Sequence, residues 1–96
     1  MNSVAWKREQ TAGAQYLVKT FEIDSFEQLH TFLQRISTTG TALGHDPDVA
    51  NNTVTPRKAG SVQLRYTTND KGKVVTELDH LMAAVTDRVY QLVTSN

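Results

Sequence analysis

Two stretches of the sequence place apolar side chains at helical spacing, and each forms a stripe that has to be buried. Residues three or four positions apart share one face of an α-helix, so both stretches are predicted to be amphipathic helices. The stripes are Phe26, Leu29, Phe32, Leu33 and Ile36 in the first, and Leu78, Leu81, Met82, Val85, Val89 and Leu92 in the second. Each stripe requires an apolar surface elsewhere in the chain to pack against.

Capping residues mark where these helices begin and end. Ser25 precedes Gln28 by three residues, and Thr76 precedes Asp79 by the same interval, which is the spacing of a capping box. Gly44 can adopt the left-handed conformation that commonly follows a helix and is predicted to end the first one. Residues 41–43 either extend that helix or form a frayed last turn.

The remaining segments predict strands, because apolar and polar side chains alternate along them. Residues 61–68 alternate most clearly, and residues 16–23 do so with one exception, Lys19, which we expect at an exposed strand end. Residues 49–54 are predicted to form a short strand and residues 3–10 a weaker edge strand. The surface against which the two helices pack is therefore predicted to be a β-sheet.

The order strand, strand, helix, strand, strand, helix predicts an α+β fold. Two helices packed on one face of a four-stranded antiparallel sheet bury both stripes with the fewest layers. A chain of 96 residues is the length of one domain, so we expect residues 1–96 to form a single domain.

Composition excludes several classes of function. Ten basic and ten acidic residues cancel, so no net field favours nucleic acid or anionic lipid, and we predict partners of neither kind. The chain has no cysteine, which removes disulfides and thiolate ligands. No apolar run approaches the roughly 20 residues of a membrane span, and the first residues do not resemble a signal peptide. We expect a soluble, cytoplasmic protein.

His45 is the residue best placed for chemistry. It lies after the first helix, between Gly44 and Pro47, beside Asp46 and Asp48. Loops held by a rigid scaffold commonly carry sites, although a His-Asp pair in a loop is more often only part of a turn.

Other polar residues have simpler interpretations. His30 and His80 lie inside the predicted helices, beside the apolar stripes, and are predicted to be partly exposed. The histidine spacing and the acidic pattern fit no metal site, so none is predicted. Arg57 and Lys58 form a basic tip on the loop 55–60, which is either a solvated hairpin end or a contact for an acidic partner.

The order of these elements and the His45 loop together resemble the pterin-4a-carbinolamine dehydratases. The resemblance covers nearly the whole chain. The matching residues are Trp6, Phe21-Glu22-Ile23, Phe26, Phe32, the loop His45-Asp46-Pro47 with Asp48 after it, Thr67-Thr68-Asn69, Gly72 and Thr76-Glu77-Leu78-Asp79.

The resemblance implies a reaction and a set of site residues. Enzymes of this family expel water from a 4a-hydroxy-tetrahydropterin, and histidines from two elements move the protons. His45 matches the first histidine of the family loop, while Asp46 stands where the second is expected and Asn69 where a later one is expected. The implied catalytic residues are His45, Asp46 and Asp79, the implied pterin-binding residues are Pro47 and Asn69, and no cofactor is implied.

These departures leave two hypotheses. The first is a non-catalytic binding or assembly protein with an eroded acid-base site and a protein client, similar to a family relative that acts as a RuBisCO assembly chaperone. The alternative is an active 4a-hydroxytetrahydrobiopterin dehydratase in pterin recycling; pterin binding without turnover is a third outcome. Under each hypothesis the resemblance implies a homo-oligomer, either a dimer or a tetramer.

Overall fold

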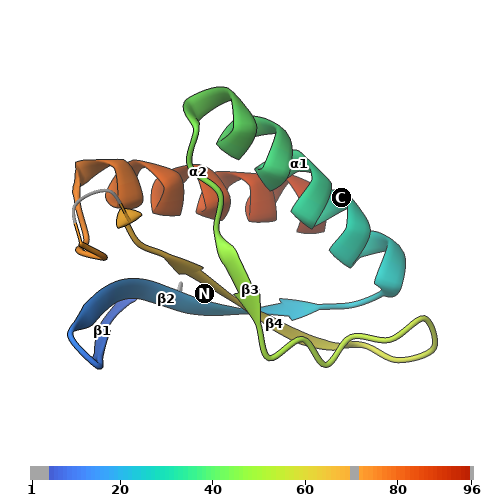
Figure 1. Cartoon of the computed structure of the whole chain (residues 1–96). Coiled ribbons are helices and arrows are strands. Elements are labelled where there is room, and N and C mark those ends of the chain that lie inside the picture. Colours follow the sequence, from blue (N-terminus) through green and yellow to red (C-terminus); the bar gives the residue numbers. More distant parts are fainter. Residues whose placement is uncertain (1–4, 70–71, 96) are drawn as a thin grey trace.

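Two helices pack on one face of a four-stranded sheet, as Figure 1 shows for the computed structural model, which describes residues 5–69 and 72–95. The sheet order is β1-β2-β4-β3, and every pairing is antiparallel. The predicted α+β fold and its element order are confirmed. The elements are β1 (Lys7–Thr11), β2 (Ala14–Ile23), α1 (Phe26–Leu43), β3 (Asp48–Ala50), β4 (Gly60–Tyr66) and α2 (Glu77–Thr94).

The strands differ from their predicted limits mainly at β3. We expected a strand over residues 49–54, but β3 ends at Ala50 because Asn51 has a left-handed backbone with φ of 50°. The side chain of Asn52 then accepts a hydrogen bond from the Val54 amide at 2.9 Å, which forms a local turn. Of the predicted edge strand 3–10, residues 3 and 4 lie outside the described residues, and β1 covers only the later part.

Lys19 corrects the expectation of an exposed strand end. It lies within β2, and its ammonium group forms an ion pair with Asp87 of α2 at 2.8 Å. The Trp6 indole N–H donates to both carboxylate oxygens of Asp87 at 3.1 Å. Lys19 therefore occupies the helix-facing side of the sheet because an opposite charge on α2 meets it there.

Helix α1 begins and ends as the capping residues predict. The Ser25 hydroxyl accepts from the Gln28 amide at 3.1 Å, although the Gln28 side chain reaches back to the Asp24 amide rather than to that of Ser25. Residues 41–43 extend the helix, and Gly44 ends it in the left-handed conformation with φ of 68°. Buried side chains of α1, including Phe32, pack with Phe21 of β2 in the main core.

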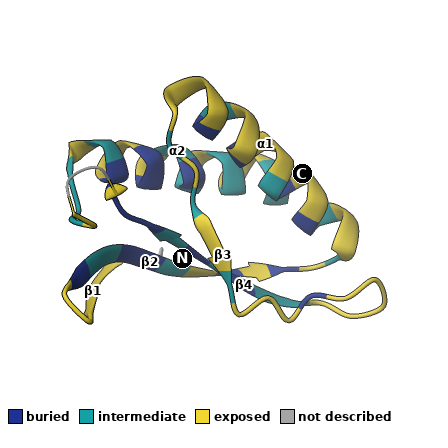
Figure 2. Cartoon of the chain, in the orientation of Figure 1, coloured by how far each residue is buried: buried dark blue, intermediate teal, exposed yellow. Residues whose placement is uncertain are grey.

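The buried face of α2 differs from the predicted stripe. Leu81 and Leu92 are about half exposed, at 49% and 51%. The buried positions are Asp79, Met82, Ala83 and Thr86, which also follow helical spacing. Figure 2 shows buried segments recurring along α2. The stripe is shifted because two polar residues of α2 find partners on β4 and the segment after it, as described below.

No helix in the described parts of the chain is long and apolar enough to cross a bilayer.

Candidate functional site

The loop after α1 turns back on the helix that precedes it. The His45 amide donates to the carbonyl of Gly40 at 2.7 Å, which holds the loop against the last turn of α1. Gly40 is buried, and a Cβ atom there would overlap the Asp46 carboxylate and lie 2.9 Å from the His45 carbonyl oxygen. The absence of a side chain at position 40 thus allows the close approach that places His45.

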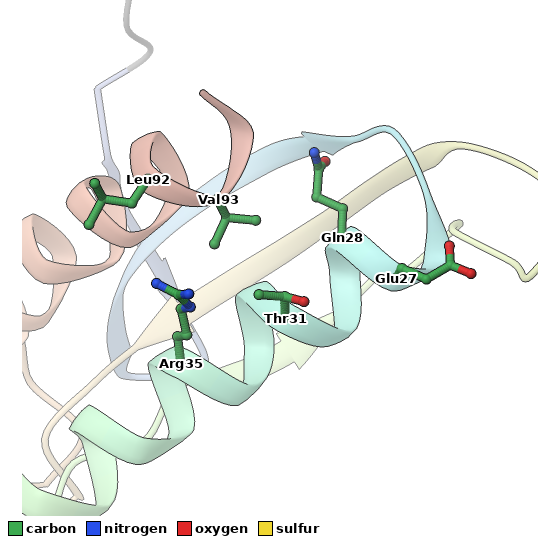
Figure 3. A pocket seen from close by; sticks show the side chains of 6 residues that line it. All are labelled: Glu27, Gln28, Thr31, Arg35, Leu92 and Val93. Atoms are coloured by element: carbon green, nitrogen blue, oxygen red, sulfur yellow. The ribbon is translucent and has the colours of Figure 1, made fainter. Parts of the chain in front are cut away.

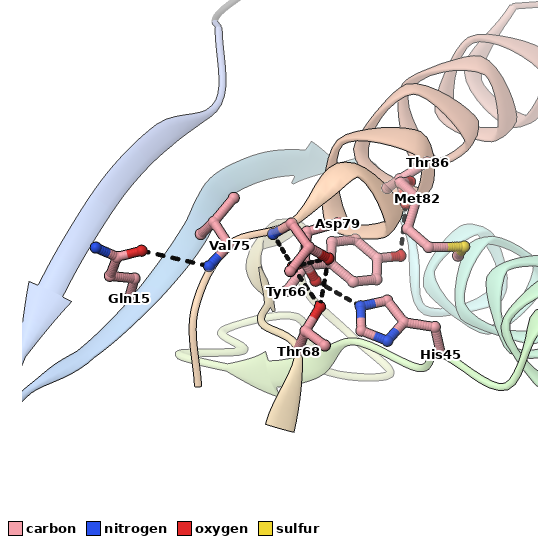
Figure 4. A network of polar contacts seen from close by, with 9 residues as sticks. Gln15, His45, Tyr66, Thr68, Val75, Asp79, Met82 and Thr86 are labelled. Carbon is pink, nitrogen blue, oxygen red and sulfur yellow. Dashed lines mark hydrogen bonds and ion pairs between the residues drawn. The ribbon is translucent and has the colours of Figure 1, made fainter. Parts of the chain in front are cut away.

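His45 meets the first turn of α2 across 34 positions of sequence. Its Nε2 lies 2.5 Å from Oδ1 of Asp79. Figure 4 marks this contact with a dashed line. The Asp79 side chain is fully buried, whereas 10% of the His45 side chain is exposed. An ionised carboxylate can only accept hydrogen bonds, so Nε2 of His45 is the donor in this contact. In the neutral imidazole, Nδ1 then carries the lone pair.

The second oxygen of Asp79 joins the site to the start of α2. Oδ2 accepts from the backbone amide of Thr76 and from the hydroxyl of Thr68, both at 2.8 Å. Asp79 therefore caps α2 through Oδ2, as predicted, and contacts His45 through Oδ1. Three donors compensate the desolvation of this buried group.

A cavity of about 630 Å³ opens beside this pair. The loop after α1 contributes His45 and Asp46, the segment after β4 contributes residues 67–69, and the start of α2 contributes Thr76 and Leu78. The volume falls within the range of ordinary small-molecule sites, roughly 300 to 1,000 Å³. Most of the lining side chains are polar, so the cavity suits a ligand rich in hydrogen-bonding groups.

The predicted site residues occupy three different places. His45, Asp46 and Asn69 line the cavity, whereas Asp79 is not a lining residue and contacts it through His45, Thr68 and Thr76. Pro47 is half-buried between the loop and β3 and is not among the lining residues. Their roles in binding or catalysis remain predictions.

Sequence reasoning missed the threonines of this site. Thr68 and Thr76 also share a hydrogen bond between their hydroxyls at 2.7 Å. The Thr67 hydroxyl is buried and, within the described residues, has no hydrogen-bond partner. The available signals were the family match at Thr67-Thr68-Asn69 and the capping position of Thr76, but threonine is ordinary in strands and at helix starts, so neither indicated a site.

Tyr66 forms the wall behind His45. Its ring is stacked on the imidazole with a centroid distance of 6.0 Å and an interplanar angle of 19°. Its hydroxyl lies 2.7 Å from that of Thr86 on α2, and both residues are fully buried. Burial raises the pKa of Tyr66 to about 12; the nearby Asp46 charge adds to the rise, and the Thr86 hydrogen bond opposes it.

This raised pKa predicts a specific loss of stability in alkali. The folded protein keeps the Tyr66 proton at pH values where the unfolded chain, with a pKa near 10, has lost it. The free energy of unfolding should therefore be unaffected below pH 10 and fall by about 2–3 kcal/mol as the pH approaches 12. Urea unfolding at a series of pH values measures this decline.

Tyr66→Phe is the control for the alkaline decline, because it keeps the ring and removes the ionisable group. Tyr90, whose pKa is raised mainly by burial, is present in both proteins and cancels in the comparison. If the wild type and the variant lose stability equally between pH 10 and 12, Tyr66 is not the titrating group.

A second hollow, of about 260 Å³, lies between α1 and α2 (Figure 3). Glu27, Gln28, Thr31 and Arg35 of α1 face Leu92 and Val93 of α2 there. It contains no histidine and no buried acid-base pair. His30 and His80 are exposed on the helices and also lie apart from the cavity at His45.

Metal chemistry has no ligand set in the described parts of the chain. Across residues 5–69 and 72–95, no group of three or more histidine or carboxylate side chains is arranged to hold an ion. Among the residues that line the cavity, His45 and Asp46 have side chains that can exchange protons, and the threonines and Asn69 can form hydrogen bonds.

The structure thus places one histidine, in contact with a buried carboxylate, at the edge of a cavity lined mostly by polar side chains. The family model for pterin 4 alpha carbinolamine dehydratase matches residues 1–89. The chain therefore belongs to the pterin-4a-carbinolamine dehydratase family.

Relatives and solved structures agree with this assignment. Proteins from three strains of Saccharolobus islandicus, provisionally named pterin-4-alpha-carbinolamine dehydratases, are each 35% identical over 78 residues, which are 81% of this chain and 72% of the relative. A transcriptional coactivator/pterin dehydratase from Brucella melitensis is similar in fold, with a TM-score of 0.69 and 20% identity over 86% of this chain and 81% of that one.

A second similar structure is a pterin dehydratase-like protein identified as a RuBisCO assembly factor in the alpha-carboxysome. Its TM-score is 0.67 and its identity 19%, over 91% of this chain and 90% of that chain. At such low identity, both solved structures establish a shared fold and no more.

Proposed function

We propose that this protein is a 4a-hydroxytetrahydropterin dehydratase that relies on His45 as its one histidine for proton transfer. The observation that carries the proposal is the contact of His45 with the buried Asp79, at the edge of a cavity large enough for a bicyclic ligand. A histidine serving only as a turn residue would not need a buried carboxylate partner. The pair has the arrangement that orients a general base in other enzymes.

The chemistry of dehydration fits a single histidine that both accepts and donates. The bond between the 4a carbon and its hydroxyl oxygen breaks, and the oxygen leaves with the bonding electrons and one added proton as water. A ring nitrogen gives up its proton while its electrons form the new double bond to carbon. Nδ1 of His45 can accept the proton from the ring nitrogen and donate a proton to the leaving oxygen. The Asp79 carboxylate faces the imidazolium that exists while His45 holds the extra proton.

Asp46 and Asn69 are assigned supporting roles. Asp46 is exposed at the cavity, where an ionised carboxylate accepts hydrogen bonds from ring N–H groups. Asn69 can donate and accept hydrogen bonds but cannot exchange a proton. Because neither replaces a histidine in proton transfer, we expect this protein to turn over more slowly than a family member with three histidines.

His45→Ala should lower the rate of 4a-hydroxytetrahydropterin breakdown by about 100- to 10,000-fold, the usual contribution of one positioned acid-base group. Stopped-flow absorbance at several protein concentrations measures the rate. His80→Ala is the matched control, because His80 is an exposed histidine of α2 directly after Asp79. Full activity in His45→Ala, or a wild-type rate no faster than buffer, would overturn the proposal.

A second candidate function is a non-catalytic binding or assembly protein, active as a homodimer or tetramer in the cytoplasm. It is favoured by Asp46 and Asn69, which occupy two of the three positions where the family resemblance places histidines. One structure of similar fold is itself a RuBisCO assembly factor. This alternative requires wild-type protein without dehydratase activity and a stoichiometric protein client recovered from native lysate.

A further inference from the structure

We propose that Tyr66 and Thr86 form a positioning pair that sets the orientation of the His45 imidazole, although neither residue lines the cavity. The inference rests on the proposed function for its kinetic consequence only. Its structural consequence, the orientation and tautomer of His45, can be measured in the free protein.

The rings of Tyr66 and His45 lie against each other, and this limits how the imidazole can turn. His45 lies on a loop, and a loop side chain held by one hydrogen bond can still rotate about the axis through that bond. The Tyr66 ring stacks on the imidazole, nearly parallel to it at 19°, with 6.0 Å between the ring centroids. This contact restricts rotation of the imidazole out of the plane in which Nε2 meets Asp79, while Nδ1 makes no hydrogen bond to residues 5–69 or 72–95.

Tyr66 is itself held in place by a hydrogen bond to Thr86 of α2. Its hydroxyl bonds to the Thr86 hydroxyl at 2.7 Å, and the Thr86 hydroxyl is itself 2.7 Å from the Met82 carbonyl one turn earlier in α2. Thr86 can donate to Met82 while it accepts from Tyr66, so both hydroxyl protons are used. The Tyr66 ring also packs against Trp6, with a centroid distance of 5.7 Å.

The contacts to the His45 imidazole come from two segments of the fold, the first turns of α2 and the end of β4. Asp79 and Thr86 both project from the buried face of α2, seven residues apart, while Tyr66 and Thr68 project from β4 and its continuation. The same two segments therefore hold His45 through its nitrogen and through its ring face (Figure 4). A buried tyrosine hydroxyl paired to a buried threonine is a costly arrangement for a residue that only fills space, since a leucine would fill the core without any polar group.

The decisive variant is Thr86→Val, which keeps the shape of the side chain and removes the hydroxyl. We expect kcat to fall about tenfold with KM changed less than twofold, because the altered residue is remote from the cavity. Thr86→Ser restores the hydroxyl and should return kcat to within twofold of the wild type. Thr94→Val is the matched control, because Thr94 makes the same backbone contact one turn back, to the Tyr90 carbonyl at 2.7 Å, away from the site.

Nitrogen NMR of the free protein tests the same inference without turnover. In the wild type we expect the two ring nitrogens of His45 to have well-separated shifts, the mark of one tautomer with its proton on Nε2. In Thr86→Val and in Tyr66→Phe the two shifts should move toward each other, and in Thr94→Val they should not. A loss of melting temperature alone is no support, since a purely structural role would also cause it.

Two results would overturn the inference. One is a His45 spectrum unchanged in both Thr86→Val and Tyr66→Phe; the other is a kcat in Thr86→Val equal to that of the wild type. An inactive wild type that shows the expected NMR changes would overturn the proposed function and leave the positioning role supported. Tyr66→Leu is avoided as the main test because loss of a fully buried ring can unfold the protein.

Discussion

Asp79→Asn is expected to abolish most of the dehydratase activity while leaving the start of α2 folded. The asparagine carbonyl can still accept from the Thr76 amide and the Thr68 hydroxyl, which bond to Oδ2 of Asp79 in the wild type. Its NH₂ group then faces Nε2 of His45, where the carboxylate had accepted a hydrogen bond. The imidazole should change tautomer, which turns Nδ1 from an acceptor into a donor. By analogy with other carboxylate–histidine pairs, we expect a rate loss of about 1,000- to 10,000-fold.

Asp79→Ala should also destabilise the protein, because it removes the acceptor for three donors. Loss of the helix cap and of partners for buried polar groups predicts about 3–4 kcal/mol of destabilisation, against about 1 kcal/mol for Asp79→Asn. Urea unfolding measures both values, and stopped-flow kinetics measures activity.

Glu77→Gln is the matched control for the Asp79 variants. It removes another acidic side chain from the first turn of α2, but an exposed one. We expect little change in activity and less than about 1 kcal/mol in stability. An Asp79→Asn protein with the wild-type rate would show that Asp79 serves only the fold.

Gly40→Ala is expected to lower both stability and activity, which is opposite to the usual effect of this change in a helix. In an exposed helix interior, alanine stabilises by about 1 kcal/mol relative to glycine. Here the new methyl group would overlap the Asp46 carboxylate and lie 2.9 Å from the His45 carbonyl oxygen. The loop must shift, so we expect a net loss of about 1–3 kcal/mol.

The shift of the loop should also lower the rate of dehydration, because it displaces His45. A displacement of about 1 Å of a reacting group can lower the rate about 100-fold, and His45 is bonded to Gly40 through its own amide. Ser37→Ala, on the exposed side of the same helix, is the control and should leave both properties nearly unchanged. A Gly40→Ala protein that is more stable than the wild type and equally active would refute the role assigned to this glycine.

Local signals in the sequence were sufficient for the fold. The apolar stripe of α1, the caps at Ser25 and Thr76 and the alternation along β4 each depend on residues a few positions apart. Segments placed less accurately depend on distant partners. Lys19 seemed out of place on a strand until Asp87, far along the chain, supplied its counter-charge.

The helix α2 shows why periodicity of apolar residues was an incomplete guide. Leu81 and Leu92 continue the stripe in sequence but are half exposed, whereas Asp79 and Thr86 are fully buried. A polar residue can be buried when its hydrogen bonds are satisfied, and the partners here lie on or just after β4. No count of apolar residues along α2 alone could have identified that face.

By itself the sequence determined the order of the elements, both ends of α1, the start of α2 and the family resemblance, and it singled out His45 as a candidate site residue. Those properties follow from short-range periodicity, capping chemistry and the motif around Pro47. Only the tertiary structure decided that His45 and Asp79 are partners, that Gly40 makes room for their loop, and that Tyr66 and Thr86 stand behind the imidazole. These contacts join residues far apart in the chain, so they exist only once the sheet has brought α1, β4 and α2 together.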